Sequence, residues 1–166
     1  TVFAYDALGS LAWSAEGTTL DGDTCDRDQV ALADRILRSY DNMNRLETVT
    51  YPDASQNLTF DYFADGQLQS ASAGGVTSSY QYNTLGLLDL ESLDIDGSLY
   101  SLDYGYDDLG NLATLTYPDG AVTQFQPDAL GRPKKVGTYA INVVYEPSGA
   151  LSSFAYGNGI LFVGES

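Results

Sequence analysis

The sequence predicts an all-β protein: tandem β-hairpins joined into one elongated, curved antiparallel sheet. The first reason is a phrase that returns about every 20 residues: an aromatic residue, usually Asp, two variable residues, Gly, one variable residue and Leu. Repetition at this period is typical of architectures in which each unit is stable only against its neighbours. The second reason is the length of the unit, which is too short for a βαβ crossover but fits two short strands and two turns.

The repeated phrase occurs seven times and occupies nearly the whole chain. Five copies keep the aromatic residue, the Gly and the Leu, and they begin at Tyr5, Tyr62, Tyr82, Tyr106 and Tyr145. Two copies are imperfect: the copy at Tyr40 has Asn44 in place of Gly, and another has Pro127 and Pro133 at its aromatic and Leu positions. We therefore interpret residues 1–166 as a single repeat array with starts near 5, 40, 62, 82, 106, 127 and 145.

The first half of the phrase predicts a turn. In the copy at Tyr106, the side chain of Asp107 can accept hydrogen bonds from the backbone ahead of it, and Gly110 tolerates a positive φ. Asn44 is one of the few other residues that tolerate this conformation. The same turn position is occupied by Asp6, Asp41, Asp107 and Asp128. Turn geometry therefore explains most of these carboxylates.

The residues after each turn predict strands. Leu112–Tyr117 is β-prone, and Tyr117-Pro118-Asp119-Gly120 then reverses the chain. We expect Tyr51-Pro52-Asp53-Ala54 to form the same turn. The returning strands alternate apolar and polar residues, which is typical of half-buried strands. Their apolar positions are Leu58, Phe60, Tyr62; Tyr80, Tyr82; Leu102, Tyr104, Tyr106; and Ile141, Val143, Tyr145. We expect Leu46, Leu68, Leu88 and Leu112 to pack the inner layer, while Gly66, Gly86 and Gly110 permit the turns.

An insertion at about residues 15–39 interrupts the array. Its first part, residues 21–26, has the composition of a loop. Its second part places Val30, Ala33 and Leu37 on one helical face, with Asp28 as a candidate cap. We therefore expect either a short helix near 28–39 or an irregular excursion.

Composition and charge exclude several classes of function. The chain has 23 Asp and Glu against 7 Lys and Arg, a net charge of −16, which repels nucleic acid and anionic membrane surfaces. No apolar run is long enough to insert into a membrane. The absence of His removes the commonest general base and metal ligand, and Cys25 has neither a disulfide partner nor a His to activate it. A paired-carboxylate hydrolase stays formally open. We expect no enzyme, and we assign no catalytic, cofactor-binding or metal-binding residue.

Two further features invite a ligand. The acidic loop at 21–28 carries Asp21, Asp23, Asp26 and Asp28, which could supply oxygen ligands to Ca²⁺, but its spacing does not match the known calcium loop. We favour a solvated loop. The 13 Tyr residues suggest the hypothesis that exposed Tyr rings bind a sugar. Most of them, however, stand at strand positions, where aromatic pairs stabilise a sheet. We favour packing for most of them.

Tyr-Asp-x-x-Gly-x-Leu followed by Tyr-Pro-Asp-Gly resembles the YD repeat of the Rhs family, which includes the teneurins and the shell components of insecticidal toxin complexes. The resemblance extends from Tyr5 to about Ile160, with close matches at Tyr40–Leu46, Tyr106–Leu112 and Pro127–Arg132. It implies a β-strip of hairpins that winds into a hollow shell, which in the polymorphic-toxin members encloses a C-terminal toxin. We find no counterpart of the family's self-cleaving C-terminal region and no toxin domain within these 166 residues, so we assign neither activity to them.

We therefore expect a non-catalytic structural repeat segment of an Rhs-type protein, secreted or at the cell surface, which builds a scaffold or an encapsulating wall. The expected partners are neighbouring repeats of the parent chain or copies of itself, with an encapsulated toxin domain or glycans as further candidates. One alternative is an adhesin-like module that binds glycans through exposed Tyr residues. Another is a β-repeat protein that self-assembles into oligomers or filaments through open strand edges.

Overall fold

The computed structural model describes residues 1–16 and 29–164, and in these residues all regular structure is β-strand apart from two 3₁₀ turns. The larger sheet holds β1 (Val2–Tyr5), β2 (Leu11–Ala15), β3 (Ile36–Tyr40), β4 (Leu46–Thr50), β5 (Leu58–Tyr62), β6 (Leu68–Ala73), β7 (Val76–Tyr82), β8 (Leu88–Ile95), β9 (Ser98–Tyr106), β10 (Leu112–Thr116) and β11 (Val122–Gln124). A smaller sheet holds β12 (Ala140–Tyr145), β13 (Leu151–Tyr156) and β14 (Leu161–Val163). The 3₁₀ turns are η2 (Leu32–Asp34) and η3 (Ala54–Gln56).

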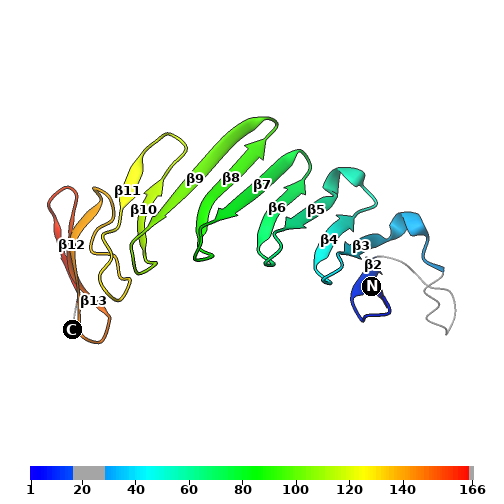
Figure 1. Cartoon of the computed structure of the whole chain (residues 1–166), viewed down its shortest axis with the longest axis horizontal. Helices are drawn as coiled ribbons and strands as arrows, with labels where there is room; N and C mark the ends of the chain where they lie inside the picture. The colour runs from blue at the N-terminus through cyan, green and yellow to red at the C-terminus, as the bar shows by residue number, and fades with distance from the viewer. Residues whose placement is uncertain (17–28, 165–166) are drawn as a thin grey trace. The chain divides into compact units, whose positions relative to one another are not determined.

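Consecutive strands are neighbours throughout both sheets. The larger sheet has 11 strands in the order β1 to β11, and the smaller has the order β12-β13-β14 (Figure 1). Every strand pair whose register is defined is antiparallel, as hairpins require. The predicted all-β fold of tandem antiparallel hairpins is therefore confirmed. That residues 1–166 form one array, and that the sheet is elongated and curved, remain predictions.

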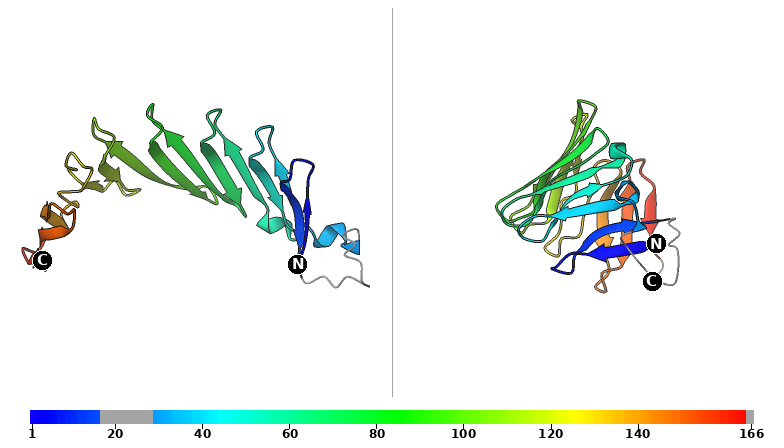
Figure 2. Two further views of the ribbon diagram at one scale, coloured as in Figure 1. Left: turned by 90° about the horizontal axis from the view of Figure 1, so that it is seen from below. Right: turned by 90° about the vertical axis from the view of Figure 1, so that its right-hand side faces the viewer.

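The chain divides into two compact units. The first comprises Thr1–Ser79 with Leu93–Ser98, and the second comprises Tyr80–Ser92 with Leu99–Ser166. Figure 2 shows that the strands of the first unit lie in a single layer. Among the described residues the only buried apolar side chains are Ala4, Ala15, Val30 and Val49. The inner-layer leucines predicted from the sequence are half-buried, because one layer of strands covers one side of each side chain only.

Between β4 and β7 the register places a row of apolar residues and a row of hydroxyl residues on opposite faces of the sheet, because directly paired residues point to the same side. In β3 the apolar row ends at Arg38, which pairs with Val49. One cross-strand row runs through Val49, Leu58, Ala73 and Val76. The adjacent row runs through Ser39, Thr48, Thr59, Ser72 and Thr77. Ser39 and Thr48 share a hydrogen bond of 2.7 Å, and Ser72 and Thr77 share one of 3.0 Å. The predicted alternation of the strands is therefore the separation of these two faces.

The prediction of a short helix near residues 28–39 is wrong for the part of that range that the structure describes. Residues 32–34 form only the short turn η2, and Ile36–Tyr40 is strand β3, while Asp28 lies outside the described residues. The cause is pairing: β3 forms antiparallel ladders with both β2 and β4. An isolated helix of this length is marginal, and the two ladders satisfy the same backbone groups.

The turn at Tyr51 also differs from the one expected. Residues 54–56 form η3, which Asp53 caps by accepting from the Ser55 N–H at 3.0 Å. Tyr51 donates its N–H to the side chain of Asn57 at 2.9 Å. Ala54 replaces the Gly that would accept a positive φ, so the chain takes a longer route between β4 and β5.

Candidate functional site

The repeated Asp organises the turn, in the way that the sequence predicts, in the four copies that carry it. Its Oδ1 accepts the N–H groups two and four residues ahead, at distances of 2.8–3.0 Å. This holds for Asp6, Asp41, Asp107 and Asp128. Asn83 replaces Asp in the copy at Tyr82 and accepts the same two bonds. The carboxylates are therefore structural caps of the turns.

The residue that ends each turn has a positive φ. Gly110 has a φ of +81° and Asn44 has a φ of +60°. The substitution of Asn for Gly in the copy at Tyr40 therefore preserves the backbone conformation, as expected of the two residue types that adopt it most readily.

The repeated Tyr links each hairpin to the one before it. Its hydroxyl donates a hydrogen bond to the backbone carbonyl at the Leu position of the preceding copy. Examples of this bond are Tyr40 to Leu11 at 3.0 Å, Tyr62 to Leu46 at 2.9 Å, Tyr106 to Leu88 at 2.7 Å and Tyr145 to Pro133 at 2.8 Å. We call this contact the tyrosine staple. It occurs in both units and explains why the aromatic position is Tyr: Phe has no hydroxyl to donate.

In two copies the residue before the repeated Leu position is Arg, and its guanidinium group packs over the ring of the next stapled Tyr. Arg45 lies 4.5 Å from the ring centroid of Tyr62, and it donates to Asp41 Oδ2 at 2.7 Å and to the carbonyl of Phe63 at 3.1 Å. Arg132 repeats the arrangement, with its guanidinium 4.6 Å from the Tyr145 ring and 2.7 Å from Asp128. Each Arg thus joins its own turn to the Tyr of the next hairpin.

The same position contacts the next turn in copies without Arg. The Ser10 hydroxyl donates to Asn44 Oδ1 at 2.9 Å. A Cβ on Gly131 would lie 2.7 Å from Asn111 Oδ1, so a side chain there would displace Asn111. Successive turns are therefore in contact, and the repeat interface consists of the turn, the staple and this linking residue.

The pKa shifts of the turn carboxylates have structural causes. The side-chain hydrogen bond from Arg132 lowers the pKa of Asp128 to about 2, and backbone hydrogen bonds lower the pKa of Asp41 and of Asp107. A lowered pKa keeps these carboxyl groups ionised, whereas a carboxyl group that acts as a general acid needs a raised pKa. Burial raises the pKa of the Tyr106 hydroxyl, which keeps the staple donor protonated.

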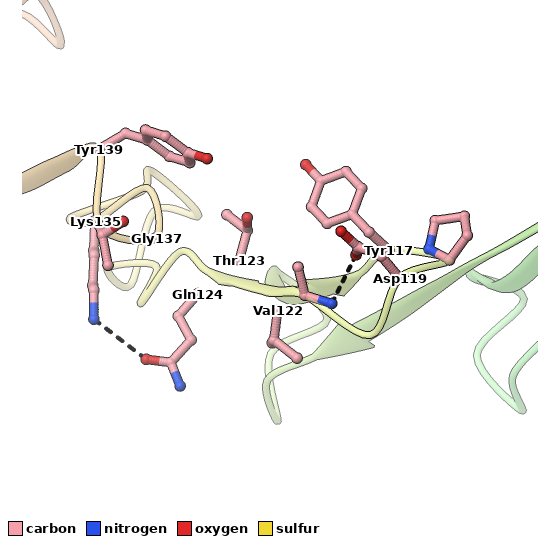
Figure 3. A pocket seen from close by; sticks show the side chains of 11 residues that line it. Tyr117, Asp119, Val122, Thr123, Gln124, Lys135, Gly137 and Tyr139 are labelled. Carbon is pink, nitrogen blue, oxygen red and sulfur yellow. Dashed lines mark hydrogen bonds between the residues drawn. The ribbon is translucent and has the colours of Figure 1, made fainter.

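A groove lies beside β11, within the second unit. Its volume is about 690 Å³, and its lining includes Tyr117, Asp119, Thr123, Lys135 and Tyr139. Figure 3 shows the two Tyr rings on either side of Thr123. We call this feature the β11 groove. The sequence alone does not reveal this groove, because its two sides come from turns about 20 residues apart.

The β11 groove lies where the repeat is most degenerate. Pro127 and Pro133 have no N–H groups, so they cannot donate to a strand ladder. They form an isolated bridge in place of a paired hairpin, and the larger sheet ends at β11. The copy in which Pro127 and Pro133 replace the repeated Tyr and Leu therefore coincides with the end of the larger sheet.

Metal binding and membrane insertion can be judged only for the residues that the structure describes. The acidic loop at 21–28 and Cys25 lie outside the described residues, so the calcium hypothesis stays a prediction. Within residues 1–16 and 29–164, no group of three or more Cys, Asp or Glu side chains is arranged to hold a metal ion. In that same part of the chain, no helix is long and apolar enough to cross a membrane.

Comparison with protein families identifies part of the array. Residues 106–138 match the family described as RHS Repeat. This segment is similar to an RHS repeat. The matched segment contains the Tyr106 turn, the Tyr117 turn and the degenerate Pro127 copy, and this result confirms the resemblance stated above. No curated protein matches the chain.

Solved structures of Tc toxin assemblies share the fold of this chain. A TcdB2–TccC3–Cdc42 structure matches 98% of the chain with a TM-score of 0.69, at 13% identity. A Tc holotoxin pore from Photorhabdus luminescens with a TccC3 variant matches 96% of the chain with a TM-score of 0.68, also at 13% identity. In both cases the chain spans only 9% of the other chain. At this identity the comparison establishes the fold of the hairpin array.

Proposed function

We propose that the chain is a non-catalytic structural segment of an Rhs-type protein, and that its hairpins form part of the wall of a scaffold or encapsulating shell. The observation that carries this proposal is the tyrosine staple, because it joins each hairpin to its neighbour and recurs in both units. This regularly recurring contact in the described residues thus holds neighbouring hairpins together.

The pattern of burial favours a segment of a wall rather than a free-standing globular domain. Only four apolar side chains are buried in the described residues, whereas many large apolar side chains are more than a third exposed. A single-layer sheet has no second layer to form a core, so its strands are stabilised by their neighbours along the array. Such an array is suited to form a surface.

The comparisons support the same proposal at the level of fold. The structures that match nearly the whole chain are toxin assemblies, and the chain corresponds to less than a tenth of each. By analogy with fold alone, the proposed partners are the neighbouring repeats of a parent chain or copies of this chain, and an enclosed toxin domain. The proposed location is secreted or at the cell surface.

A repeat deletion tests whether the chain is an array of equivalent units. Deleting residues 62–81 removes one period and brings Tyr82 to the place that Tyr62 occupies opposite Leu46. We expect this variant to keep a β-sheet circular dichroism spectrum and cooperative urea unfolding. Deleting residues 62–71 removes half a period and one turn, so every later strand runs in the opposite direction. We expect that control to lose most of its stability. Equal stability of the two variants would contradict the array.

Imaging of the parent protein tests the wall. The complete reading frame that contains this chain is expressed and examined by electron cryomicroscopy. We expect the hairpins of residues 40–126 to lie within a continuous β-wall that surrounds a cavity. A parent protein in which these hairpins form an isolated appendage would overturn the proposal, even if the deletion experiment succeeds.

A further inference from the structure

An exposed Leu or Met recurs at one position of the turns. The residue directly before the repeated Gly position is Leu or Met in five of the seven copies of the phrase. These side chains are 64–80% exposed, and they are Leu8, Met43, Leu85, Leu109 and Leu130. Single exposed leucines are common on protein surfaces, but exposed apolar side chains that gather in one place mark an interaction surface.

The turn itself does not need an apolar residue at this position. The backbone N–H of the residue donates to the side chain of the turn Asp or Asn, for example from Leu109 to Asp107 Oδ1 at 2.9 Å. A residue of any type except Pro supplies that N–H group. The other two copies carry Asp65 and Ser148 at this position. The apolar side chains therefore serve something outside the turn.

In the second unit, Leu85, Leu109 and Leu130 stand on successive turns of the repeated phrase. In a sheet whose antiparallel strands follow chain order, every second turn lies at the same edge, and Figure 1 shows the β7–β8 and β9–β10 turns at one edge. The Leu130 turn comes next, because a Cβ on Gly131 would lie 2.7 Å from Asn111 Oδ1 in the turn before it. We call these three leucines the leucine row.

The spacing of the leucine row matches the repeat of an α-helix. Adjacent strands lie about 4.8 Å apart, so turns separated by two strands recur about every 9.6 Å. Residues seven apart on one face of a helix recur about every 10.5 Å, a difference that side chains can absorb over three contacts. An extended segment fits less well, because residues on one of its faces recur at about 6.7 and 13.4 Å.

The charge beside the leucine row favours a basic partner. The second unit has four turns of the repeated phrase, at residues 83–87, 107–111, 128–132 and 146–150. Together they contain four carboxylates and one cation. That cation, Arg132, pairs with Asp128 at 2.7 Å, whereas the exposed Asp108 side chain makes no hydrogen bond or ion pair with the described residues. A second copy of the chain would bring another charge of −16, which opposes self-association at this edge.

We infer that the leucine row is a docking surface for a basic amphipathic α-helix of a partner protein. Each leucine packs between successive apolar residues of that helix, while its Lys and Arg side chains reach Asp108 and the neighbouring turn carboxylates. The tyrosine staple uses other atoms, so helix docking and cohesion between hairpins are tested separately.

Binding of two synthetic peptides tests this surface. Both have about 21 residues, the length of three heptads, and the same number of Leu, Lys and Arg residues. One has all its Leu on one helical face, and the other has them distributed around the helix. Each carries a fluorescent label and is titrated with the chain at about 150 mM salt, which screens exposed charges. We expect the amphipathic peptide to bind at least about tenfold more tightly. Equal binding would show attraction by charge alone and would overturn the docking surface.

Two variants locate the binding. Leu109→Ser should weaken the binding of the amphipathic peptide about tenfold, because it removes most of one apolar contact. Ser is compatible with the turn, since Ser148 has this position in another copy. The matched control is Leu99→Ser, at a 67% exposed residue near the other end of β9, which should leave the affinity unchanged. Equal losses in the two variants would place the binding elsewhere and overturn the leucine row.

Sedimentation of the chain alone tests the competing occupant. We expect a monomer at the concentrations used for the titration. Dimers that Leu109→Ser abolishes would assign the leucine row to a second copy and overturn the helix. Neither result affects the deletion and imaging experiments, so the wall is judged separately.

Discussion

Removing one staple hydroxyl should lower the stability of the chain measurably. In Tyr106→Phe the ring stays, and the 2.7 Å hydrogen bond to the Leu88 carbonyl is lost. A protein hydrogen bond contributes about 0.5–1.5 kcal/mol net, and a fully buried acceptor left unpaired costs about 1–3 kcal/mol. Both residues are half-buried, so water can reach part of the freed carbonyl. We therefore expect a loss near the middle of the first range, about 1 kcal/mol.

Urea unfolding followed by circular dichroism measures this loss. With a slope of about 2 kcal/mol per molar urea, a loss of about 1 kcal/mol lowers the midpoint by about 0.5 M. The slope itself should not change, because the variant exposes the same surface on unfolding. Tyr62→Phe should behave alike, since it removes the equivalent bond to Leu46. The two losses should add, because the two staples share no partner.

Tyr5→Phe is the matched control. Tyr5 has the same place in the repeated phrase, but its hydroxyl makes no hydrogen bond in the described residues, and the side chain is 60% exposed. The substitution should change the midpoint by no more than about 0.25 M, because a neutral surface change alters stability by at most about 0.5 kcal/mol. An unchanged midpoint in Tyr106→Phe, or an equal loss in Tyr5→Phe, would refute the staple as the source of cohesion between hairpins.

Three further predictions concern the turns. Arg45→Lys keeps the charge but loses the planar stacking on Tyr62, and should cost about 0.5–1 kcal/mol in urea unfolding; no loss would exclude the stack as a stabilising contact. Gly110→Val places a β-branched residue at a φ of +81° and should cost about 1–3 kcal/mol in thermal unfolding, while Gly110→Asn should cost clearly less; equal melting temperatures would contradict the turn. The pKa of Asp128 falls from 3.8 to about 2 on folding, so its contribution is complete above about pH 5 and is lost as the pH falls from about 4 to 2. Asp128→Asn should flatten the acid limb of the stability profile, and an unchanged limb would show that this carboxylate is not linked to folding.

The turns could be predicted from the sequence because their chemistry is local. Asp107 and Gly110 are three residues apart, and the bonds that define the turn stay within five residues. Residue type alone therefore encodes the geometry, through a side-chain acceptor at one position and tolerance of a positive φ at the other. The same locality made Asn44 recognisable as a substitute for Gly.

The insertion was ambiguous because its pattern fits two periods. Val30, Ala33 and Leu37 follow helical spacing, yet Ile36–Tyr40 is strand β3. The decision comes from pairing with β2 and β4, and the sequence of the segment itself contains no information on those partners. The η3 turn shows the reverse case: Ala54 in place of Gly was visible in the sequence, but its effect on the connection was not.

The sequence by itself determined the period, the all-β class and the turn chemistry, because each depends on residues that are close together along the chain. The tertiary structure decided which atoms meet between hairpins. The hydroxyl of Tyr106 reaches the carbonyl of Leu88, and Thr123 lies between Tyr117 and Tyr139, only after strands have paired in one register. Register is a property of neighbouring strands together, so neither the tyrosine staple nor the β11 groove can be read from a single repeat.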